Sequence, residues 1–440
     1  MTTNISRRGI LAGSLAAGVA ALAGCAGSPA SPGGGASGGE SLQVWGGVPG
    51  ENGPDALCKA FADANPGVTV TYTRYVNDDQ GNVKLDTSLQ GGVPIDVFFS
   101  YGPDVFARRA GAGLALDLTE KIESDQTLAE FHRSASVLKN PVIDDKLYTL
   151  PCTESTNFVF VNKAIFDAAG IGVPTAWTTD EFTGIAAELT KGKVIGAFDS
   201  PMTSRGTLGS NWLYADDGRK SNFTNPAFSA DIARRLQMQQ AGTIMPRQRV
   251  LAEKLTTFQQ KPFLAGELAM LGSSAYVMRY IKDLKEYPHE FVTAAAPEPK
   301  PAGDASFNTG GLGDFPAVSS KSANPDLAWK FVHFWFTNAA THLAAGGRVP
   351  SAKLSAADAT TALAAMTDNN SELFDLESFK TVLFGQPRPR FSVDTIFTAQ
   401  TELITIKNKL EEEVLLGARD LSTFAAEATK QGDAALATAS

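Results

Sequence analysis

The chain has 440 residues, of which 47 are acidic and 38 are basic, so its formal net charge is -9. This charge argues against nucleic acid as a partner and against electrostatic docking on an acidic membrane. The length leaves room for two or three domains.

The first 25 residues predict export. Arg7 and Arg8 precede residues 9–24, a stretch without charge that is shorter than the roughly 20 apolar residues needed to span a bilayer. Residues 6–11 resemble a twin-arginine motif, and residues 22–25 resemble a bacterial lipobox. We therefore predict a signal peptide over residues 1–24 that is cleaved before a lipidated Cys25; the alternative is a chance cysteine.

A flexible tether follows the predicted lipidation site. Residues 26–40 consist of Gly, Ala, Ser and Pro with a single Glu, and such a composition cannot build a core. With Cys25 it would hold a folded body on the outer face of the cytoplasmic membrane, or in the periplasm, without spanning the membrane.

The body opens with alternating strands and helices. Strands are predicted at residues 42–45, 68–75 and 95–99, and helices begin near Pro54 and Pro103, a residue suited to the first helical turn. Strand, helix and strand in succession indicate parallel pairing and an α/β fold. The turns contain no glycine-rich phosphate-binding motif, so a nucleotide site is not indicated.

Two loops in this region are candidates for a binding site. Residues 46–53 and 100–104 each follow a strand and precede a helix. Ligands in open parallel sheets bind beyond the carboxyl ends of the strands. We therefore expect Trp45, Glu51, Tyr101 and Asp104 to lie near one cleft.

A series of motifs runs through the rest of the body. The motifs lie at residues 148–151, 157–163, 166–171, 174–182, 263–270, 310–312, 324–331 and 349–351. Their order and spacing resemble the family 1 extracellular solute-binding proteins of the maltose-binding-protein type. The segment at residues 174–182 departs from the family pattern, because extra residues interrupt its compact Thr-Trp-Asp-Glu.

The resemblance implies a two-lobed periplasmic-binding-protein-like fold of type II, with the ligand cleft between the lobes. Lobe 1 would comprise residues 41–151 and 302–350, and lobe 2 residues 152–301 and 351–440. The protein would be a monomer that captures a small polar solute by domain closure and delivers it to an ABC permease in the membrane.

The resemblance also suggests where the ligand contacts lie. A sugar needs aromatic plates for its apolar faces and polar side chains for its hydroxyl groups. The candidates are Trp45, Glu51, Tyr101, Asp104, Glu154, Ser155, Asn157, Trp212, Tyr214, Ser274, Tyr276, Gly310, Gly311 and Arg348. Trp212 is the favoured aromatic plate, with packing in the core as its alternative.

Several alternatives stay open at this point. The candidate loops hold more carboxylates and aromatic rings than cations, which favours a mono- or oligosaccharide over glycerol phosphate, but an amine or polyamine would also suit the acids. A ligand-sensing co-receptor for a signalling system would have the same site. Cys58 and Cys152 could form a disulfide or stay as two buried thiols.

The chain lacks sequence signatures of catalysis. Its four histidines show no metal-ligand spacing such as H-E-x-x-H, and there is no G-x-S-x-G motif. We therefore expect no enzyme activity, no metal and no cofactor. Arg388 and Arg390 lie in a proline-flanked segment that is interpreted as structural, and residues 411–413, three glutamates, are interpreted as the solvated face of a helix.

Overall fold

The computed structural model describes residues 40–134, 142–143, 145–256, 258–301, 307–352 and 354–439. All of them belong to Gly39–Ser440, one of the two units into which the chain divides. The predicted signal peptide, Cys25 and the tether up to residue 39 lie outside the described residues. Among the described helices, none is long and apolar enough to cross a membrane.

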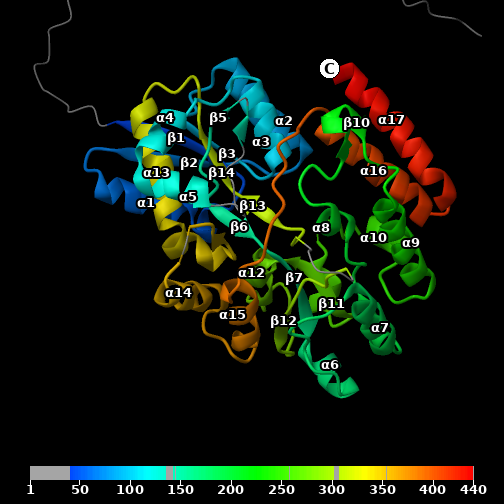
Figure 1. Ribbon diagram of the computed structural model, residues 1–440. Helices are drawn as coiled ribbons and strands as arrows, with labels where there is room; N and C mark the ends of the chain where they lie inside the picture. Colours follow the sequence, from blue (N-terminus) through cyan, green and yellow to red (C-terminus); the bar gives the residue numbers. More distant parts are fainter. Residues whose placement is uncertain are drawn as a thin grey trace, which may run out of the picture. The chain divides into compact units, whose positions relative to one another are not determined.

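A four-stranded sheet contains the strands predicted near the start of the body (Figure 1). β1 (Ser41–Gly46) lies between β2 (Thr69–Arg74) and β3 (Val97–Ser100) and pairs with both in parallel. β14 (Phe315–Val318), which comes much later in the sequence, pairs antiparallel with β3. The three predicted strands and their parallel pairing are therefore confirmed.

Two helices that begin with proline pack on each other beside this sheet. α1 (Pro54–Ala64) contributes Phe61, which meets Phe331 of α13 (Pro325–Leu343) edge to face with 5.1 Å between ring centres. Cys58 and Cys152 lie in the same buried cluster as free thiols, so the disulfide alternative is not realised. The other elements of this region are η1 (Gly50–Asn52), α2 (Asp79–Gly91), α3 (Pro103–Gly111), α4 (Thr119–Ser124), α5 (Gln126–Ser134), β4 (Val142–Ile143) and β5 (Lys146–Leu147).

A second four-stranded sheet has the spatial order β12-β7-β11-β8. β7 (Asn157–Asn162) pairs antiparallel with β12 (Thr293–Pro297) and β11 (Leu268–Ser274), and β8 (Ile195–Ala197) joins β11 in parallel. The side chain of Asn162 then caps α6 (Lys163–Ala169), which ends at Gly170 in a left-handed conformation. This strand, Asn-Lys pair and glycine-terminated helix match what the family resemblance implies.

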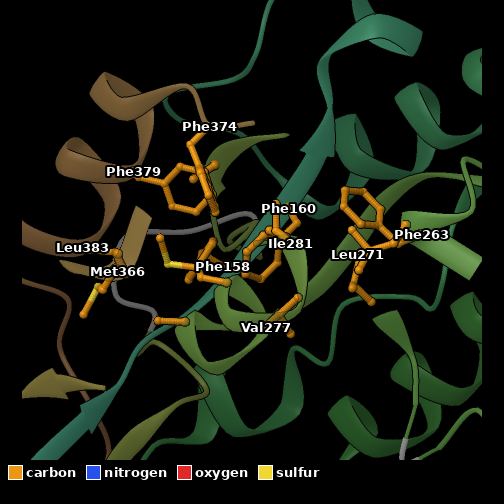
Figure 2. Close-up of a cluster of buried hydrophobic side chains, with 14 of the residues drawn as sticks. Phe158, Phe160, Phe263, Leu271, Val277, Ile281, Met366, Phe374, Phe379 and Leu383 are labelled. Atoms are coloured by element: carbon orange, nitrogen blue, oxygen red, sulfur yellow. The ribbon is translucent and has the colours of Figure 1, made fainter. Parts of the chain in front are cut away.

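The second sheet packs on helices from distant parts of the chain (Figure 2). Phe158 and Phe160 of β7 lie 4.5 Å apart between ring centres, and both approach Phe379 of α15 (Leu376–Phe384). Phe263 of α11 (Gln260–Leu264) and Met366 of α14 (Ala356–Thr367) complete the same cluster. Other elements nearby are α7 (Thr179–Leu189), α10 (Arg247–Ala252), η3 (Ala275–Val277), α12 (Met278–Ile281) and η4 (Ala344–Gly346).

A small antiparallel sheet lies between the two larger ones (Figure 1). Its central strand, β6 (Thr153–Ser155), pairs with β13 (Gly311–Gly313) on one side and β15 (Val349–Pro350) on the other. β6 connects the first sheet to β7, and β13 leads back to β14. The chain therefore passes between the two large sheets through these short strands.

The C-terminal helices pack against the region that follows β8. α16 (Gln400–Leu415) and α17 (Phe424–Ala439), drawn in red and orange in Figure 1, lie on α9 (Pro226–Gln240). The remaining elements here are α8 (Ser204–Leu208), β9 (Tyr214–Ala215), η2 (Asp216–Gly218), β10 (Lys220–Ser221) and η5 (Leu421–Thr423).

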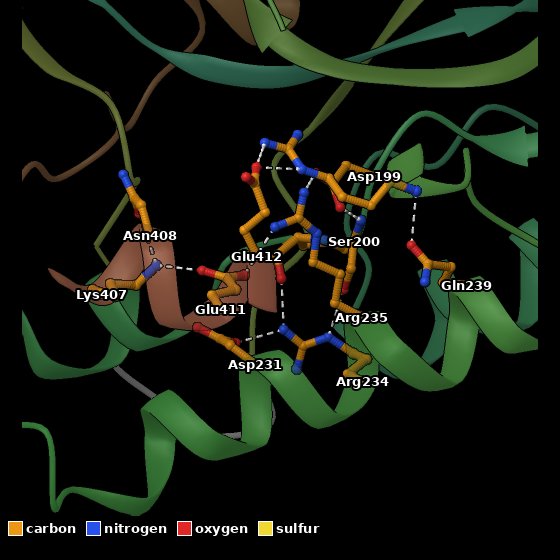
Figure 3. A network of polar contacts seen from close by, with 12 residues as sticks. Asp199, Ser200, Asp231, Arg234, Arg235, Gln239, Lys407, Asn408, Glu411 and Glu412 are labelled. Carbon is orange, nitrogen blue, oxygen red and sulfur yellow. Dashed lines mark hydrogen bonds and ion pairs between the residues drawn. The ribbon is translucent and has the colours of Figure 1, made fainter. Parts of the chain in front are cut away.

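A buried ionic network fastens α16 to this region (Figure 3). Arg235 of α9 pairs with Asp199 and, at 2.9 Å, with Glu411, which also accepts from Lys407 at 2.7 Å. Burial alone would raise the pKa of Glu411, but Lys407 and Arg235 lower it below the ordinary value. The interpretation of residues 411–413 as a solvated face was therefore wrong for Glu411, which is buried, whereas Glu412 and Glu413 stay partly exposed and each pair with an arginine.

Candidate ligand-binding cleft

The structure contains a cleft of about 260 Å³ where the two sheet regions meet near β13. Its wall includes the start of α3, the strand β13, the segment before α16 and the first turn of α16. The lining residues are Pro103, Asp104, Arg205, Thr309, Gly310, Gly311, Leu312, Phe315, Phe391, Ser392, Val393, Asp394, Gln400 and Ile404. Of the sequence-predicted residues, Asp104, Gly310 and Gly311 lie directly on this wall.

A buried ion pair forms one side of the cleft. Nη1 of Arg205 lies 3.3 Å from Oδ2 of Asp394, whose side chain is 1% exposed. Asp394 also accepts hydrogen bonds from the backbone N–H of Asn211 at 2.7 Å and from Nε2 of Gln400 at 3.3 Å. These bonds fix the orientation of Arg205 and Gln400 at the cleft surface.

Three polar atoms on this wall are buried without a hydrogen-bond partner in the described part of the chain. They are Nε of Arg205, Oγ of Ser392 and Oε1 of Gln400. The first is a donor, the last is an acceptor, and a hydroxyl group can do both. Buried polar groups in folded proteins almost always have partners. This set therefore suits a ligand that both donates and accepts hydrogen bonds.

Two helices face each other across the cleft. Oδ2 of Asp104, in the first turn of α3, lies 3.5 Å from Oγ1 of Thr401 in the first turn of α16. Neither helix has a side-chain cap at its N-terminus. The contact is long and exposed, so it holds the two helices together only weakly.

The two loops that follow β1 and β3 meet, as expected from parallel strands. The hydroxyl oxygen of Tyr101 accepts hydrogen bonds from the backbone N–H groups of Gly47, at 2.6 Å, and Val48, at 3.3 Å. Burial raises the pKa of Tyr101, so its hydroxyl stays protonated at physiological pH. The guanidinium of Arg348 lies 5.9 Å from the centre of the Tyr101 ring.

Arg348 and Glu154 belong to ion pairs near the small central sheet. Nε of Arg348 lies 3.6 Å from the carboxylate of Asp314, and burial raises the pKa of Asp314 although Arg348 opposes the shift. Oε1 of Glu154, in β6, accepts from Arg388 at 2.6 Å and from Thr156 at 3.0 Å. Arg388 thus contributes to this region through an ion pair that its position in the sequence did not indicate.

The chain makes a tight turn next to β6. The side chain of Asn308 accepts from the backbone N–H groups of Asn157 and Gly310, and Asn157 donates from its own side chain to Thr309 at 3.0 Å. A side chain at Gly310 would overlap the carbonyl oxygen of Ser155. Ser155, Asn157 and Gly310 therefore hold the turn that places Thr309 on the cleft wall.

Trp212 and Tyr214 lie in the hydrophobic cluster beneath α16. Trp212 is 6% exposed, Phe228 stacks on it with 5.3 Å between ring centres, and the guanidinium of Arg205 lies 5.9 Å from the ring centre. Tyr214 is also buried and donates its hydroxyl to the carbonyl of Thr398 at 3.0 Å. Both residues support the wall that carries Arg205 instead of presenting an aromatic plate.

The other predicted residues lie away from the cleft wall. Trp45 is half-buried and has the ammonium of Lys84 at 5.6 Å from its ring centre, and Glu51 is exposed in η1. Tyr276 accepts a hydrogen bond from Gln259 at 2.7 Å, and Ser274 is half-buried at the end of β11. None of these four residues lines the cleft of about 260 Å³.

The structure adds cleft residues that sequence reasoning missed. Arg205, Ser392, Asp394 and Gln400 line the wall, but they come from two segments far apart in the sequence. The only local signal was the charged, proline-flanked segment before Phe391. In the described residues, no group of histidine, cysteine and acidic side chains is arranged to hold a metal ion.

Comparison with known proteins places the chain among solute-binding proteins. The chain is 27% identical over 154 residues to a multiple sugar-binding protein of Streptococcus mutans, a region that covers 35% of this chain and 33% of that protein. The chain therefore spans only about a third of the length of this curated relative.

Solved structures share the fold over almost the whole chain. A sugar transporter from Rhizobium etli in an open conformation has a TM-score of 0.69 and 21% identity, covering 90% of this chain and 99% of that one. An ABC substrate-binding protein from Listeria monocytogenes in complex with cycloalternan has a TM-score of 0.70 and 20% identity, covering 91% and 99%. The α/β periplasmic-binding-protein fold is thus confirmed.

The family assignment rests on the sequence itself. Residues 50–342 match the family described as bacterial extracellular solute-binding protein, which covers more than half of the chain. Proteins of this kind bind a solute and do not transform it, in line with the lack of catalytic motifs in the sequence. The chain belongs to the bacterial extracellular solute-binding protein family.

Proposed function

We propose that this protein is the substrate-binding component of an ABC importer and that it captures a mono- or oligosaccharide in the cleft. The observation that carries the proposal is the set of unpartnered buried atoms on the cleft wall, on Arg205, Ser392 and Gln400. The printed names of the relatives support it, since they describe a multiple sugar-binding protein, a sugar transporter and a complex with cycloalternan.

The chemistry of the wall suits sugar hydroxyl groups. A hydroxyl can accept from Nε of Arg205 and donate to Oε1 of Gln400, while Phe391 and Phe315 offer apolar surface for the C–H faces of a ring. Leaving such polar atoms unpaired costs about 1–3 kcal/mol each, so a ligand that pairs with them gains both affinity and specificity.

The charge of the cleft favours a neutral ligand over the alternatives. Arg205 is neutralised by Asp394, and Asp104 is the other charged residue of the wall. Glycerol phosphate would face two carboxylates, and a polyamine, which carries several positive charges, would find only the carboxylate of Asp104 without a cation. A saccharide carries no charge and needs no such partners.

Domain closure would deliver the ligand. We assign residues 41–151 and 302–350 to lobe 1 and residues 152–301 and 351–440 to lobe 2, joined through β6, β13 and β15. In this arrangement Asp104 of lobe 1 and Thr401 of lobe 2 approach each other across the cleft. Closing the lobes on a sugar would present a changed surface to the permease.

Of the predicted contacts, we retain Tyr101, Asp104, Glu154, Gly310, Gly311 and Arg348 as residues at or next to the ligand.

The location of the protein follows from the same proposal. The family is extracellular, and we propose that a twin-arginine signal exports the chain and that lipidation of Cys25 anchors it to the outer face of the membrane.

A ligand-sensing co-receptor for a signalling system would use the same binding site. Neighbouring genes for a permease or for a sensor kinase would distinguish the two roles.

The test is a thermal-shift screen of residues 26–440 against sugars, sugar phosphates and polyamines. A sugar at 100 times its Kd should add about 2.7 kcal/mol of stability, visible as a higher Tm. The variant Ser392→Ala removes an unpartnered hydroxyl, so it should not lower the Tm of the free protein and should weaken sugar binding by about 2- to 12-fold.

Ser204→Ala is the matched control, because Ser204 is also buried and unpartnered but does not line the cleft. It should leave sugar binding unchanged. A shift with phosphates or amines alone would refute the sugar proposal, and equal binding by both serine variants would move the site away from this wall.

A further inference from the structure

A second cavity lies behind the cleft and is larger than it. The cavity measures about 580 Å³ and is lined by the end of β12, by residues 307–309, by α15 and by the segment after α15. We call it the proline-lined cavity, because its wall includes Pro174, Pro297, Pro299, Pro301, Pro387 and Pro389. Proline restricts the backbone, so a cavity with these walls is preformed, and its volume is in the range of small-molecule sites.

Residues 307–309 are held by backbone hydrogen bonds where this cavity adjoins the cleft. The backbone N–H of Phe307 donates to Gly206 at 2.8 Å, and that of Asn308 donates to Arg390 at 2.7 Å. Thr309 lines both spaces. The cavity is therefore a neighbour of the proposed sugar site and not an extension of it.

Glu298 is a half-buried carboxylate on the wall of this cavity. Its oxygens accept hydrogen bonds from the backbone N–H of Thr309, at 2.8 Å, and from the Thr309 hydroxyl. Among the described residues, no lysine or arginine pairs with it. Burial raises the pKa of Glu298 to about 7, although both hydrogen bonds from Thr309 oppose the shift. A carboxylate has about four acceptor positions, so two of them stay open.

The other charged groups of the cavity do not neutralise Glu298. Arg388 is paired with Glu154, and Asp375 accepts from the backbone N–H of Ser378 at the start of α15. Lys300, Glu377 and Arg390 also line the cavity but are exposed to solvent. Glu298 is thus a half-buried carboxylate that has no counter-ion among the described residues and that keeps open acceptor positions.

We propose that the proline-lined cavity is a second binding site, which takes a small monoamine with its ammonium group on the Glu298 carboxylate. The carbon skeleton of the amine lies against the prolines and against Val382 and Phe307. The ammonium group supplies the missing positive charge and donates to the open acceptor positions of Glu298. The site has its own lining residues and shares only Thr309 with the cleft.

The probes are cyclohexylamine and cyclohexanol, which have the same shape and differ in charge. Isothermal titration of residues 26–440, without sugar, should give a Kd for cyclohexylamine at least 10-fold lower than that for cyclohexanol. Because only ionised Glu298 binds the ammonium group, a pKa of about 7 predicts roughly 10-fold weaker binding at pH 6 than at pH 8.

Three variants separate the site from its surroundings. Glu298→Gln keeps the shape and can still bond with Thr309, but it should remove amine binding and its pH dependence. Thr381→Trp, at an exposed position of α15 on the cavity wall, should block the cavity. Glu377→Gln, which removes an exposed carboxylate at the same cavity, should bind the amine as the wild type does.

Equal affinity for the amine and the alcohol, or unchanged amine binding in Glu298→Gln, would overturn the proposal. Loss of the sugar-induced thermal shift in Glu298→Gln would also overturn it, since it would make Glu298 part of the sugar site through Thr309. A protein that binds the amine but no sugar would leave this site standing and refute the sugar proposal.

Discussion

Replacing Trp212 by alanine separates a role in the core from a role as a sugar-stacking plate. The side chain is 6% exposed and has Phe228 stacked on it at 5.3 Å and Arg205 over its ring at 5.9 Å. Truncation of a buried tryptophan costs about 3–5 kcal/mol through lost burial and the cavity that remains. Trp212→Ala should therefore destabilise the ligand-free protein by about this amount.

The expected change in Tm follows from the size of the folded unit. At about 2.1 cal/mol/K per residue, the roughly 400 residues of Gly39–Ser440 unfold with about 0.8 kcal/mol/K, so a loss of 4 kcal/mol lowers the Tm by about 5 °C. Differential scanning calorimetry without ligand measures this directly.

Trp212→Phe is the matched control. It keeps an aromatic ring for Phe228 and removes no internal hydrogen bond, since the indole N–H has no partner among the described residues. Trp212→Phe should therefore lose less stability than Trp212→Ala and should keep the sugar-induced shift. A ligand-free Trp212→Ala protein with the Tm of the wild type would refute the core assignment.

Three further predictions concern other parts of the fold. Gly347→Ala should destabilise the protein by at least about 1 kcal/mol in urea unfolding. The φ angle of Gly347 is 77°, and the added carbon would overlap the carbonyl oxygen of Ala275. An unchanged urea midpoint would contradict this geometry. Arg235→Met should cost about 1–3 kcal/mol, because it leaves the half-buried carboxylate of Asp199 without its arginine, while Glu411 keeps Lys407 as a partner. The pKa of Glu411 is lower in the folded protein than in the unfolded chain. Its contribution to stability is therefore present above the unfolded pKa and is lost as pH falls through the folded pKa. If the wild type and Arg235→Met lost equal stability on acidification, the result would argue against the pair. Burial raises the pKa of Cys58 to about 12 and also raises that of Cys152, so at pH 8 iodoacetamide should modify neither thiol in the native protein and both in urea, as read by mass spectrometry. Rapid native labelling, or none in urea without reductant, would contradict two buried free thiols.

The sequence predicted the parts of the fold that depend on local pattern. Strand periodicity and turn residues located β1, β2 and β3, and the parallel pairing of β1 with β3 brought the loops after them together at Tyr101 and Gly47. The motif that begins at residue 157 located β7 and α6 through its resemblance to the family signature. Each of these elements is specified by residues close together in the chain.

The parts that could not be predicted depend on contacts between distant segments. Asp394 pairs with Arg205 across 189 positions of the sequence, and Glu411 pairs with Arg235 across 176. The three consecutive glutamates of α16 have the pattern of a solvated helix face, and only the packing of α16 on α9 brings arginines to them. Trp212 was expected at the ligand because aromatic residues serve both cores and sugar sites, and its sequence context does not distinguish the two.

The ion pairs explain how one wall can be both rigid and ready for a neutral ligand. Asp394 binds Arg205 and Gln400 at the same time, so the donor and the acceptor of the cleft are held by a single carboxylate. Trp212 lies beneath Arg205, and α16 is held to α9 by the ion pair between its Glu411 and Arg235. The unpartnered donor and acceptor are therefore held in place before a ligand binds. A sugar that pairs with them would lose little binding free energy to the ordering of these side chains. Under the proposed function, affinity then depends on the match of hydroxyl positions to this fixed pattern.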